Sequence, residues 1–360
     1  MKVGIIGGGQ LARMLAISGY PLGLDFVVLE PGKGACSTQL AEHICADYDD
    51  EKALAELAEK VDVVTYEFEN VPARAVEFLA DKCPVYPPAQ ALACARDRLN
   101  EKTMFRGLDI GTAEFATVDS LEDLQKAVVK IGLPSILKTR TLGYDGKGQQ
   151  MLKEGTDLAA VWKDFNDAPA ILESLVPFDR EVSIIAVKNV SGEMAFYPIA
   201  ENLHREGILR LSTSQTNDPV QALAEDYARR VLEKLDYVGV LAIEFFQLGD
   251  QLLANEMAPR VHNSGHWSIE GSICSQFENH IRAVIDQPLG STKNVGFPSM
   301  VNLIGDLPDS NKILSIAGAH LHLYGKSPRA GRKVGHITVR GEDEKNRQDL
   351  LQQVHAHVSE

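Results

Sequence analysis

The sequence predicts an α/β protein that is α+β in parts, in which helices cover both faces of a parallel sheet near the N-terminus. Over the first hundred residues, apolar segments of strand length such as KVGII (2–6) and DFVVLE (25–30) alternate with helical segments such as QLARMLAISGY (10–20). Strands and helices that alternate in this way build parallel sheets. The chain of 360 residues is longer than one hydrophobic core normally supports, so we expect two or three packed units.

The first unit is expected to end near residue 97, after the strand VDVVTYE and a helix that Pro72 opens at its first turn. A smaller unit follows at about 112–175, in which the strands SILKT and QQMLK flank a glycine-rich loop. After it come the strands EVSIIAV and MAFYPIA, a helix at about 218–235, the strand pair VGVLAIEFFQL and QLLANEMAP, and a basic, glycine-rich tail loop.

Charge and composition exclude several classes of function. The formal charge of −14 argues against a nucleic-acid-binding protein, which would need a broad basic face. The five cysteines are scattered without a CxxC pair, so we expect neither a disulfide framework nor a zinc site, and a reducing cytoplasm fits best. The chain has no run of about 18 apolar residues and does not begin like a signal peptide, so we expect no membrane association.

The N-terminal segment GIIGGGQLA (4–12) fits the pattern Gly-x-Gly-x-x-Gly/Ala that follows the first strand of dinucleotide-binding folds. Glu30 lies about 20 residues further on, where such a fold places its ribose-binding acid. An NAD(P)-dependent oxidoreductase is therefore one candidate. Any strand-to-helix turn that brings backbone N–H groups to an anion needs the same glycines, and helix packing alone also explains them, so these alternatives stay open.

Two glutamates in one strand pair indicate a metal site. Glu244 lies inside an apolar strand, and Glu256 follows twelve residues later. If residues 249–251 form a three-residue loop, the two glutamates lie directly opposite each other on one face of the hairpin. Facing carboxylates in apolar surroundings repel each other unless a cation lies between them, and oxygen ligands such as these and Asn255 suit Mg²⁺. The alternative is that one glutamate is exposed or salt-bridged.

The segment LKTRTLGYDGKGQQML (137–152) combines a lysine on a strand with a glycine-rich loop. It is not a Walker A loop, because Lys147 is followed by Gly148 rather than by serine or threonine. Lys138 can direct a point charge at a phosphate, while the glycines at 143, 146 and 148 let the loop fold over other phosphates. A mobile turn is the alternative, but together with a carboxylate pair for magnesium the loop predicts phosphoryl transfer.

Two further segments predict a site for a second, anionic substrate. The tail loop YGKSPRAGRKVGH carries four cations within eight residues, namely Lys326, Arg329, Arg332 and Lys333. An arginine fork suits a phosphate monoester, although a solvated basic turn is the alternative. The segment PRVHNSGHW packs polar side chains that are poor core material into seven residues: Arg260, His262, Asn263, Ser264 and His266.

The chain resembles the ATP-grasp carboxylate–amine ligases of purine biosynthesis. The resemblance covers nearly the whole chain and rests on GGGQLARM, YEFENV, LKTRTLGYDGKGQ, ESLVPFDRE, NEMAPRVHNSGHW and YGKSPRAGRKVGH. It implies an ATP-grasp fold with an N-terminal Rossmann-like parallel-sheet domain at 1–97, an ATP-grasp region at 98–290 with a lid at about 112–175, and a C-terminal segment at 291–360 that packs on the ATP-grasp core. Ala12 and Leu142 stand where glycine is more usual in the family, and neither change removes a ligand.

The resemblance also implies roles for individual residues. The catalytic residues would be Lys138, Glu244, Glu256, Arg260 and His262, and Glu244 and Glu256 would hold Mg²⁺ or Mn²⁺. Contacts to ATP would come from Arg98, Lys138, Gly143, Tyr144, Asp145, Gly146, Lys147, Gly148, Gln149, Glu173, Ser174, Leu175, Val176, Glu181, His204, Asn255 and Glu256. Contacts to a ribonucleotide would come from Gln10, Leu11, Glu69, Tyr144, Asn263, Lys326, Arg332 and Lys333.

The reaction that the resemblance implies is the ATP- and bicarbonate-dependent carboxylation of the exocyclic amine of 5-aminoimidazole ribonucleotide through carboxyphosphate. Because carboxyphosphate decomposes in water, the glycine-rich loop should close as a lid. The alternatives are a formate-dependent glycinamide ribonucleotide ligase or another ATP-grasp ligase, an NAD(P)-dependent oxidoreductase, and a non-catalytic nucleotide sensor. The resemblance further implies a cytoplasmic homodimer that has small-molecule substrates and neither a nucleic-acid nor a membrane partner.

Overall fold

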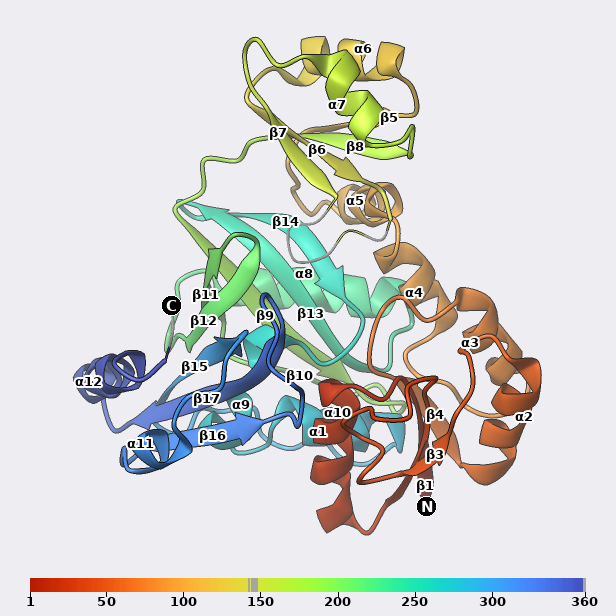
Figure 1. Ribbon diagram of the computed structural model, residues 1–360, viewed down its shortest axis with the longest axis vertical. Coiled ribbons are helices and arrows are strands. Elements are labelled where there is room, and N and C mark those ends of the chain that lie inside the picture. The colour runs from red at the N-terminus through yellow and green to blue at the C-terminus, as the bar shows by residue number, and fades with distance from the viewer. Residues whose placement is uncertain (142, 144–147, 359–360) are drawn as a thin grey trace.

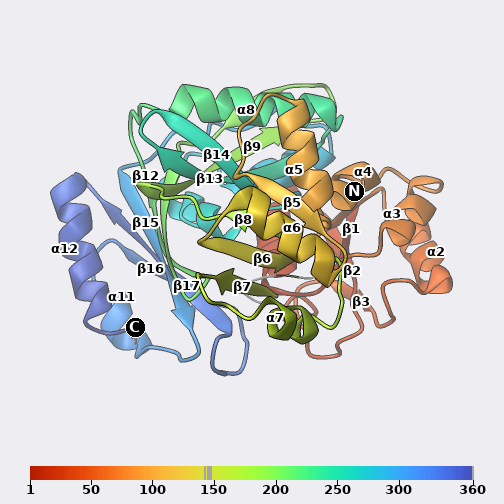
Figure 2. The same cartoon turned by 90° about the horizontal axis from the view of Figure 1, so that it is seen from above.

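The computed structural model describes residues 1–141, 143 and 148–358. Over these residues the strands form three sheets, of four, nine and four strands. They correspond to an N-terminal unit, a large central sheet and a small unit that projects above the central sheet (Figure 1). Seen from above, the small unit lies over the middle of the molecule (Figure 2). None of the helices in the described part of the chain is long and apolar enough to cross a membrane.

The N-terminal sheet is parallel, as the alternating pattern predicts, and its strands run in the order β3-β2-β1-β4. Its two faces bury different helices: α1 covers one face, and α2 and α3 cover the other. The elements of this unit are β1 (Lys2–Ile6), α1 (Gln10–Gly19), η1 (Tyr20–Leu22), β2 (Asp25–Leu29), β3 (Glu42–Ile44), α2 (Glu51–Lys60), β4 (Val63–Tyr66), α3 (Ala73–Ala80) and α4 (Ala89–Ala95).

The small unit follows helix α5, which runs from Arg98 to Gly107 beside the central sheet. Its antiparallel strands have the order β5-β8-β6-β7, and α6 and α7 cover one face with a separate apolar core. Its elements are β5 (Phe115–Val118), α6 (Leu121–Ile131), β6 (Ser135–Thr139), β7 (Gln149–Leu152), α7 (Leu158–Asp164) and β8 (Ala170–Ser174). We call this unit the lid.

The central sheet has the order β14-β13-β9-β11-β12-β15-β17-β16, and β10 pairs with β9 off this path. The C-terminal strands therefore extend the same sheet, because β15 pairs with β12. Its strands are β9 (Arg180–Lys188), β10 (Met194–Phe196), β11 (Ala200–Arg205), β12 (Ile208–Ser214), β13 (Gly239–Leu248), β14 (Gln251–Ala258), β15 (Phe297–Ile304), β16 (Ala319–Leu323) and β17 (Lys333–Gly341). The helices of this region are α8 (Gln221–Lys234), η2 (Asn263–Gly265), α9 (Ser268–Gly271), α10 (Gln276–Val284), α11 (Ser310–Leu314) and α12 (Glu344–His355).

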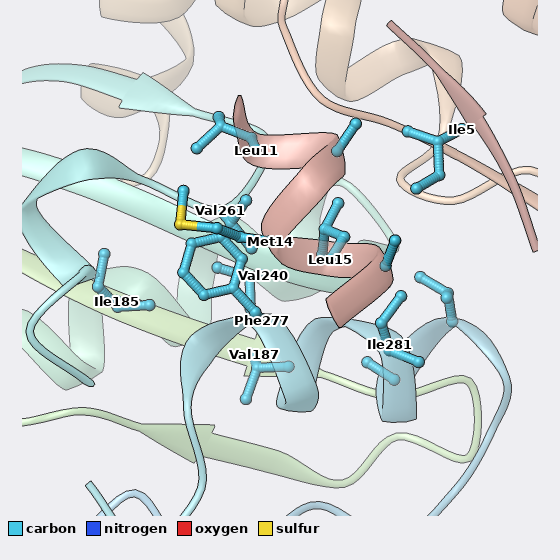
Figure 3. Close-up of a cluster of buried hydrophobic side chains, with 14 of the residues drawn as sticks. Ile5, Leu11, Met14, Leu15, Ile185, Val187, Val240, Val261, Phe277 and Ile281 are labelled. Atoms are coloured by element: carbon cyan, nitrogen blue, oxygen red, sulfur yellow. The ribbon is translucent and has the colours of Figure 1, made fainter. Parts of the chain in front are cut away.

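Helix α1 joins the N-terminal unit to the central sheet. Met14 and Leu15 of α1 lie in one buried cluster with Phe277 and Ile281 of α10 and with Val240 of β13 (Figure 3). Burying side chains of this size contributes roughly 1.5–3 kcal/mol each. The glycine turn at the start of α1 is therefore held in a fixed position against the central sheet.

A buried histidine makes a second joint between the same two units. His280 of α10 accepts the Val240 N–H at Nδ1 (3.1 Å), and its Nε2 lies 2.8 Å from the Thr65 hydroxyl of β4. Since Nδ1 is an acceptor, the ring is neutral and its Nε2–H donates to Thr65. Burial lowers the pKa of His280 to about 3, so the neutral form persists through the physiological range.

Candidate active site

A cavity of about 750 Å³ lies where the three sheets meet. Its described lining comes from the glycine turn before α1, from β6 and β7 of the lid, from β13 and β14, and from the two polar segments near residues 260 and 330. The predicted residues that line it are Gln10, Leu11, Glu69, Arg98, Lys138, Gly143, Gln149, Glu181, His204, Glu244, Asn255, Glu256, Arg260, His262, Asn263, Lys326 and Lys333.

The predicted pairing of Glu244 with Glu256 is present, but the predicted turn is wrong. The loop between β13 and β14 has two residues rather than three, because Leu248 pairs with Gln251. The missing residue reappears as a bulge: Phe245 pairs with Ala254, whereas Glu244 pairs with Glu256. Asn255 is therefore the extra residue of a β-bulge, a device that re-aims side chains next to active sites.

Two consecutive side chains of α5 hold the backbone of this bulge. Lys102 Nζ donates to the Asn255 carbonyl (3.1 Å), and Glu101 Oε1 accepts the Met257 N–H (2.7 Å). Both side chains are almost fully buried. A bulge frees backbone groups from the strand ladder, and buried groups of this kind need partners. Helix α5 therefore determines how Asn255 and its neighbours are presented to the cavity.

The carboxylate hairpin has the properties of a cation site. Burial, and then the neighbouring charge of Glu256, raise the pKa of Glu244 to about 7. The Asn255 Oδ1 atom is buried and has no hydrogen-bond partner among the described residues. A divalent cation would bind both carboxylates and give this oxygen a partner, so the donor set fits Mg²⁺. The described residues contain no cluster of three or more His, Cys, Asp or Glu ligands, so other ligands would have to come from phosphate or water.

Positive charges stand beside this hairpin. Arg98 Nη1 lies 3.1 Å from Glu256 Oε2. Lys138 on β6 points at the cavity and forms a 2.9 Å ion pair with Glu173 on β8, and Lys102 lies 3.5 Å from the same Glu173 oxygen. Although burial opposes it, the two lysines hold the pKa of Glu173 below its usual range. These cations suit an anion bound next to the carboxylate pair.

His204 and Glu181 form a pair on neighbouring strands. His204 Nδ1 lies 2.6 Å from Glu181 Oε2, across β11 and β9. Burial lowers the pKa of His204, but the contact with Glu181 and the charge of Glu244 outweigh it, so the pKa is raised. An ion pair of this kind at the cavity wall presents polar atoms that can bind hydroxyl groups.

The N-terminal turn binds carboxylates of the protein itself. Glu67 accepts the N–H groups of Gly9 and Ala12, and Glu30 accepts that of Gly8 (2.9 Å). A Cβ atom at Gly8 would lie 2.6 Å from Glu30, which explains the glycine there. The N–H groups that a dinucleotide would need are already bound, so the structure favours the alternative interpretation, a strand-to-helix turn that holds another anion, over an NAD(P) site.

The segment after β14 faces the same cavity. Arg260 Nε lies 2.5 Å from Glu69 Oε2, and although burial opposes it, this arginine lowers the pKa of Glu69. His262 Nε2 lies 3.5 Å from Glu244 Oε1. Burial, reinforced by Arg260, holds the pKa of His262 well below its usual value, so this ring is neutral. Asn263 lines the cavity while its amide pairs with the amide of Asn302.

The tail loop contributes two of its four cations to the described lining. Lys326 donates to Gln10 Oε1 of the N-terminal turn, and Lys333 lies at the cavity wall. Arg332 donates to the carbonyl and hydroxyl oxygens of Ser327 within the loop (3.2 and 3.1 Å) and is not part of the described lining. The structure therefore brings lysines, rather than the predicted arginine fork, next to the N-terminal turn.

The glycine-rich loop is described only at its ends. Gly143 and Gln149 line the cavity, and Gly148 has a positive φ of +69° that favours glycine. The predicted ATP contacts Tyr144, Asp145, Gly146 and Lys147 lie outside the described residues, as does Leu142. Of the predicted ATP contacts Glu173, Ser174, Leu175 and Val176, the first two end β8 and the last two follow it, where the chain leaves the lid toward β9. None of the four is part of the described lining.

Sequence reasoning missed several residues of the cavity and its supports. Glu67 lies two positions before the predicted Glu69, yet nothing local distinguishes a carboxylate that caps a helix from one that binds substrate. Glu101 and Lys102 lie one helical turn before Met104 and Phe105, so their position on the buried face of α5 could have been noticed. Phe178 and Tyr324 also line the cavity, and single aromatic residues carry no signal of their own.

Fold and site together define an ATP-dependent ligase of the ATP-grasp class. Residues 103–277 match the ATP-grasp domain, residues 1–96 match the ribonucleotide synthetase preATP-grasp domain, and residues 299–349 match the phosphoribosylaminoimidazole carboxylase C-terminal domain. The chain belongs to the N5-carboxyaminoimidazole ribonucleotide synthase family. The predicted ATP-grasp fold, family and class of enzyme, an ATP-dependent carbon–nitrogen ligase, are confirmed.

Relatives match over nearly the full length. The N5-carboxyaminoimidazole ribonucleotide synthase of Pseudomonas aeruginosa is 54% identical over 358 residues, which cover 99% of each chain. The crystal structure of the corresponding synthetase from Thermus thermophilus superposes with a TM-score of 0.95 at 52% identity and covers 99% of each chain. A synthase from Aspergillus clavatus in complex with ADP and 5-aminoimidazole ribonucleotide has a TM-score of 0.89 at 32% identity, covering 99% of this chain and 98% of the other.

Proposed function

We propose that the protein uses ATP and bicarbonate to carboxylate the exocyclic amine of 5-aminoimidazole ribonucleotide in purine biosynthesis. The products are 5-(carboxyamino)imidazole ribonucleotide, ADP and phosphate. The observation that carries the proposal is that the carboxylate hairpin, Lys138, the N-terminal turn and the tail lysines share one cavity. A reaction between a nucleotide and a phosphorylated ribonucleotide needs both sets of groups side by side.

Nucleotide binding is assigned to the wall made by the lid and the central sheet. Lys138 and Arg98 would meet the phosphates, and the Glu181–His204 pair would meet the ribose. Glu244, Glu256 and Asn255 would hold Mg²⁺, or Mn²⁺, which would neutralise charge on the phosphates. The facing carboxylates and the unpartnered Asn255 oxygen support this assignment.

The residues of the cavity fit a two-step reaction. Bicarbonate is a poor electrophile, and its phosphorylation by ATP gives carboxyphosphate, from which phosphate can leave. Lys138 places positive charge where the transferred phosphoryl group carries negative charge. The amine then takes the carboxyl group, either from carboxyphosphate or from CO₂ formed inside the cavity, and releases a proton. The lid above the cavity would keep water away from the reactive intermediate.

The opposite wall fits the ribonucleotide. Lys326 and Lys333 supply positive charge for a phosphate monoester next to Gln10 and Leu11. The Glu69–Arg260 pair orients a carboxylate and a guanidinium toward the space between the two walls. Because His262 is neutral, we assign it a hydrogen-bonding role toward the reacting groups rather than that of a positive charge.

Release of ADP by the purified protein tests the proposal. It should depend on both bicarbonate and 5-aminoimidazole ribonucleotide, and omission of either should reduce it to background. Turnover with formate and glycinamide ribonucleotide in their place would instead identify the sister ligase. ATP hydrolysis that is indifferent to the ribonucleotide would contradict the proposed reaction.

We also propose a homodimer, which rests on the family resemblance alone, and a cytoplasmic location, which the scattered cysteines support. Sedimentation velocity on the purified protein tests the oligomeric state, and a single monomeric species at micromolar concentration would contradict it. Neither nucleic acid nor a membrane is expected as a partner, which the net charge of −14 supports for nucleic acid.

A further inference from the structure

Three buried charged side chains are in contact with one another at the wall of the cavity. Lys138 lines the cavity and is 7% exposed, whereas Glu173 is 2% exposed and Lys102 is 1% exposed. Glu173 Oε2 lies 2.9 Å from Lys138 Nζ and 3.5 Å from Lys102 Nζ. Glu173 and Lys102 are not part of the described lining of the cavity, so only Lys138 of the three faces it. One carboxylate is thus shared by two ammonium groups, of which one faces the substrate.

This arrangement creates a conflict for Lys138. In the structure its ammonium group is paired with Glu173, yet the proposed function requires it to serve a phosphate. A buried carboxylate that loses its counterion is strongly destabilised. If Glu173 had only one partner, each nucleotide that recruited Lys138 would leave Glu173 without compensation.

Lys102 is placed to remove this conflict. Its Nζ atom is held by the Asn255 carbonyl (3.1 Å) as well as by Glu173. It belongs to α5, whereas Lys138 and Glu173 lie on the neighbouring lid strands β6 and β8. Its position at Glu173 therefore does not depend on where Lys138 points.

We propose that Lys102 is a positioning residue that keeps Glu173 neutralised, so that Lys138 can turn its charge toward the phosphates of a bound nucleotide. Lys102 acts through Glu173 and makes no contact with the nucleotide. The inference rests on the proposed function in one respect, namely that a nucleotide binds at Lys138. It extends that function by explaining why two lysines serve one carboxylate, since the three groups together leave one positive charge for the phosphates.

Two other roles for Lys102 make different predictions. Lys102 could serve only the bulge through the Asn255 carbonyl, or it could contact phosphate itself. In both cases the loss of Lys102 would not be repaired by removing the charge of Glu173. Under the proposed role it would be repaired, because a neutral glutamine at 173 needs no counterion.

The experiment compares Lys102→Met, Glu173→Gln and the double variant by calorimetric titration with the magnesium complex of ADP. Lys102→Met is expected to weaken binding about tenfold or more, because the buried Glu173 carboxylate then competes with the nucleotide for Lys138. Glu173→Gln is expected to bind as well as the wild type or more tightly. The double variant is expected to regain most of the affinity that Lys102→Met loses.

Controls separate this role from folding and from the proposed function. Lys102→Arg keeps the charge and should bind the ADP complex with normal affinity. Lys126 forms an exposed ion pair on α6, so Lys126→Met should also leave this affinity unchanged. Thermal unfolding reports whether each variant folds. A double variant that binds no better than Lys102→Met overturns the inference, as does a loss of affinity in Glu173→Gln alone, which decides the matter even if Lys102→Met does not fold. Failure of the wild type to bind the ADP complex would instead overturn the proposed function.

Discussion

The N-terminal turn and the β13–β14 hairpin both carry carboxylates at or beside the cavity, but the polar groups of the two regions are satisfied to different degrees. In the turn, Glu30 and Glu67 accept backbone N–H groups, so that donors and acceptors satisfy one another. In the hairpin, Glu244 faces Glu256, and the side-chain oxygen of Asn255 has no partner among the described residues. The first arrangement completes the fold, whereas the second leaves binding capacity for a cation.

The comparison also shows that a sequence pattern does not identify a ligand. The glycine turn has the sequence of a dinucleotide site, and its backbone does offer N–H groups to an anion. The anion is a carboxylate of the same chain. The hairpin matches no such pattern, yet it leaves Asn255 Oδ1 without a partner among the described residues, although Glu256 pairs with Arg98. Whether a polar group already has a partner separates the two regions better than the residue types do.

The largest effect is expected at the hairpin. Glu256→Gln should leave the fold intact and lower the turnover number at least about 100-fold, because an amide binds a divalent cation far less well than a carboxylate. ADP release under saturating substrates measures turnover, and circular dichroism checks the fold. The exposed Glu77 on α3 offers a matched control, since Glu77→Gln should leave turnover unchanged. Normal turnover in Glu256→Gln would remove the metal assignment.

A side chain whose polar atoms all have hydrogen-bond partners within the protein should affect stability rather than turnover. His280 is the clearest example, because both of its ring nitrogens have partners. Its pKa lies at about 3, below the ordinary value of 6.5. Between these pH values the unfolded chain binds a proton that the folded protein does not, so the free energy of unfolding falls as pH falls from 6.5 toward 3. One proton corresponds to a slope of at most about 1.4 kcal/mol per pH unit.

Urea unfolding of wild type and His280→Asn between pH 4 and 7 measures this contribution. An asparagine can still accept the Val240 N–H but does not titrate, so the variant should be less stable at pH 7 and should lose less stability on acidification. The titrating carboxylates and the other histidines are common to both proteins. Parallel pH profiles would show that His280 is not the neutral joint described above.

In the turn, Glu30→Ala is expected to lower the free energy of unfolding by about 1–3 kcal/mol, because donors in a partly buried site lose their acceptor. Those donors are the N–H groups of Gly8 and Gly32 and the hydroxyl of Tyr48. Glu30 is not part of the described cavity lining, so the Michaelis constants should not change. Glu77→Ala serves as the control for stability. A variant as stable as the wild type would mean that water replaces the carboxylate without cost.

Much of the fold follows from the sequence, for identifiable reasons. The alternation of apolar strands and helices predicted the parallel N-terminal sheet, since its pairing involves neighbouring segments. The extension of the central sheet by β15 was not predicted, because β15 pairs with β12, about ninety residues earlier in the chain. Pairing at that distance leaves no local pattern in either strand.

The candidate site was predicted in part, and partly through two errors that cancel. A three-residue loop and a two-residue loop with a bulge both bring Glu244 opposite Glu256, so the pairing was right although the turn was wrong. The bulge depends on Glu101 and Lys102 of α5, about 150 residues away. His204 likewise gains its role only from Glu181 on a neighbouring strand. Contacts between segments so far apart in the chain cannot be predicted from local sequence patterns and are seen only in the folded structure.

The smallest effect is expected at an exposed ion pair on the lid. Lys126 Nζ lies 2.6 Å from Glu122 Oε1, closer than Lys138 lies to Glu173 at 2.9 Å, yet the side chains of the exposed pair are 68% and 75% accessible. Water screens such a pair, so Lys126→Ala should change the free energy of unfolding by no more than about 0.5 kcal/mol and should leave turnover unaltered. Denaturant unfolding and ADP release measure both quantities. A larger loss would mean that distance, rather than burial and partner count, decides which polar groups matter in this protein.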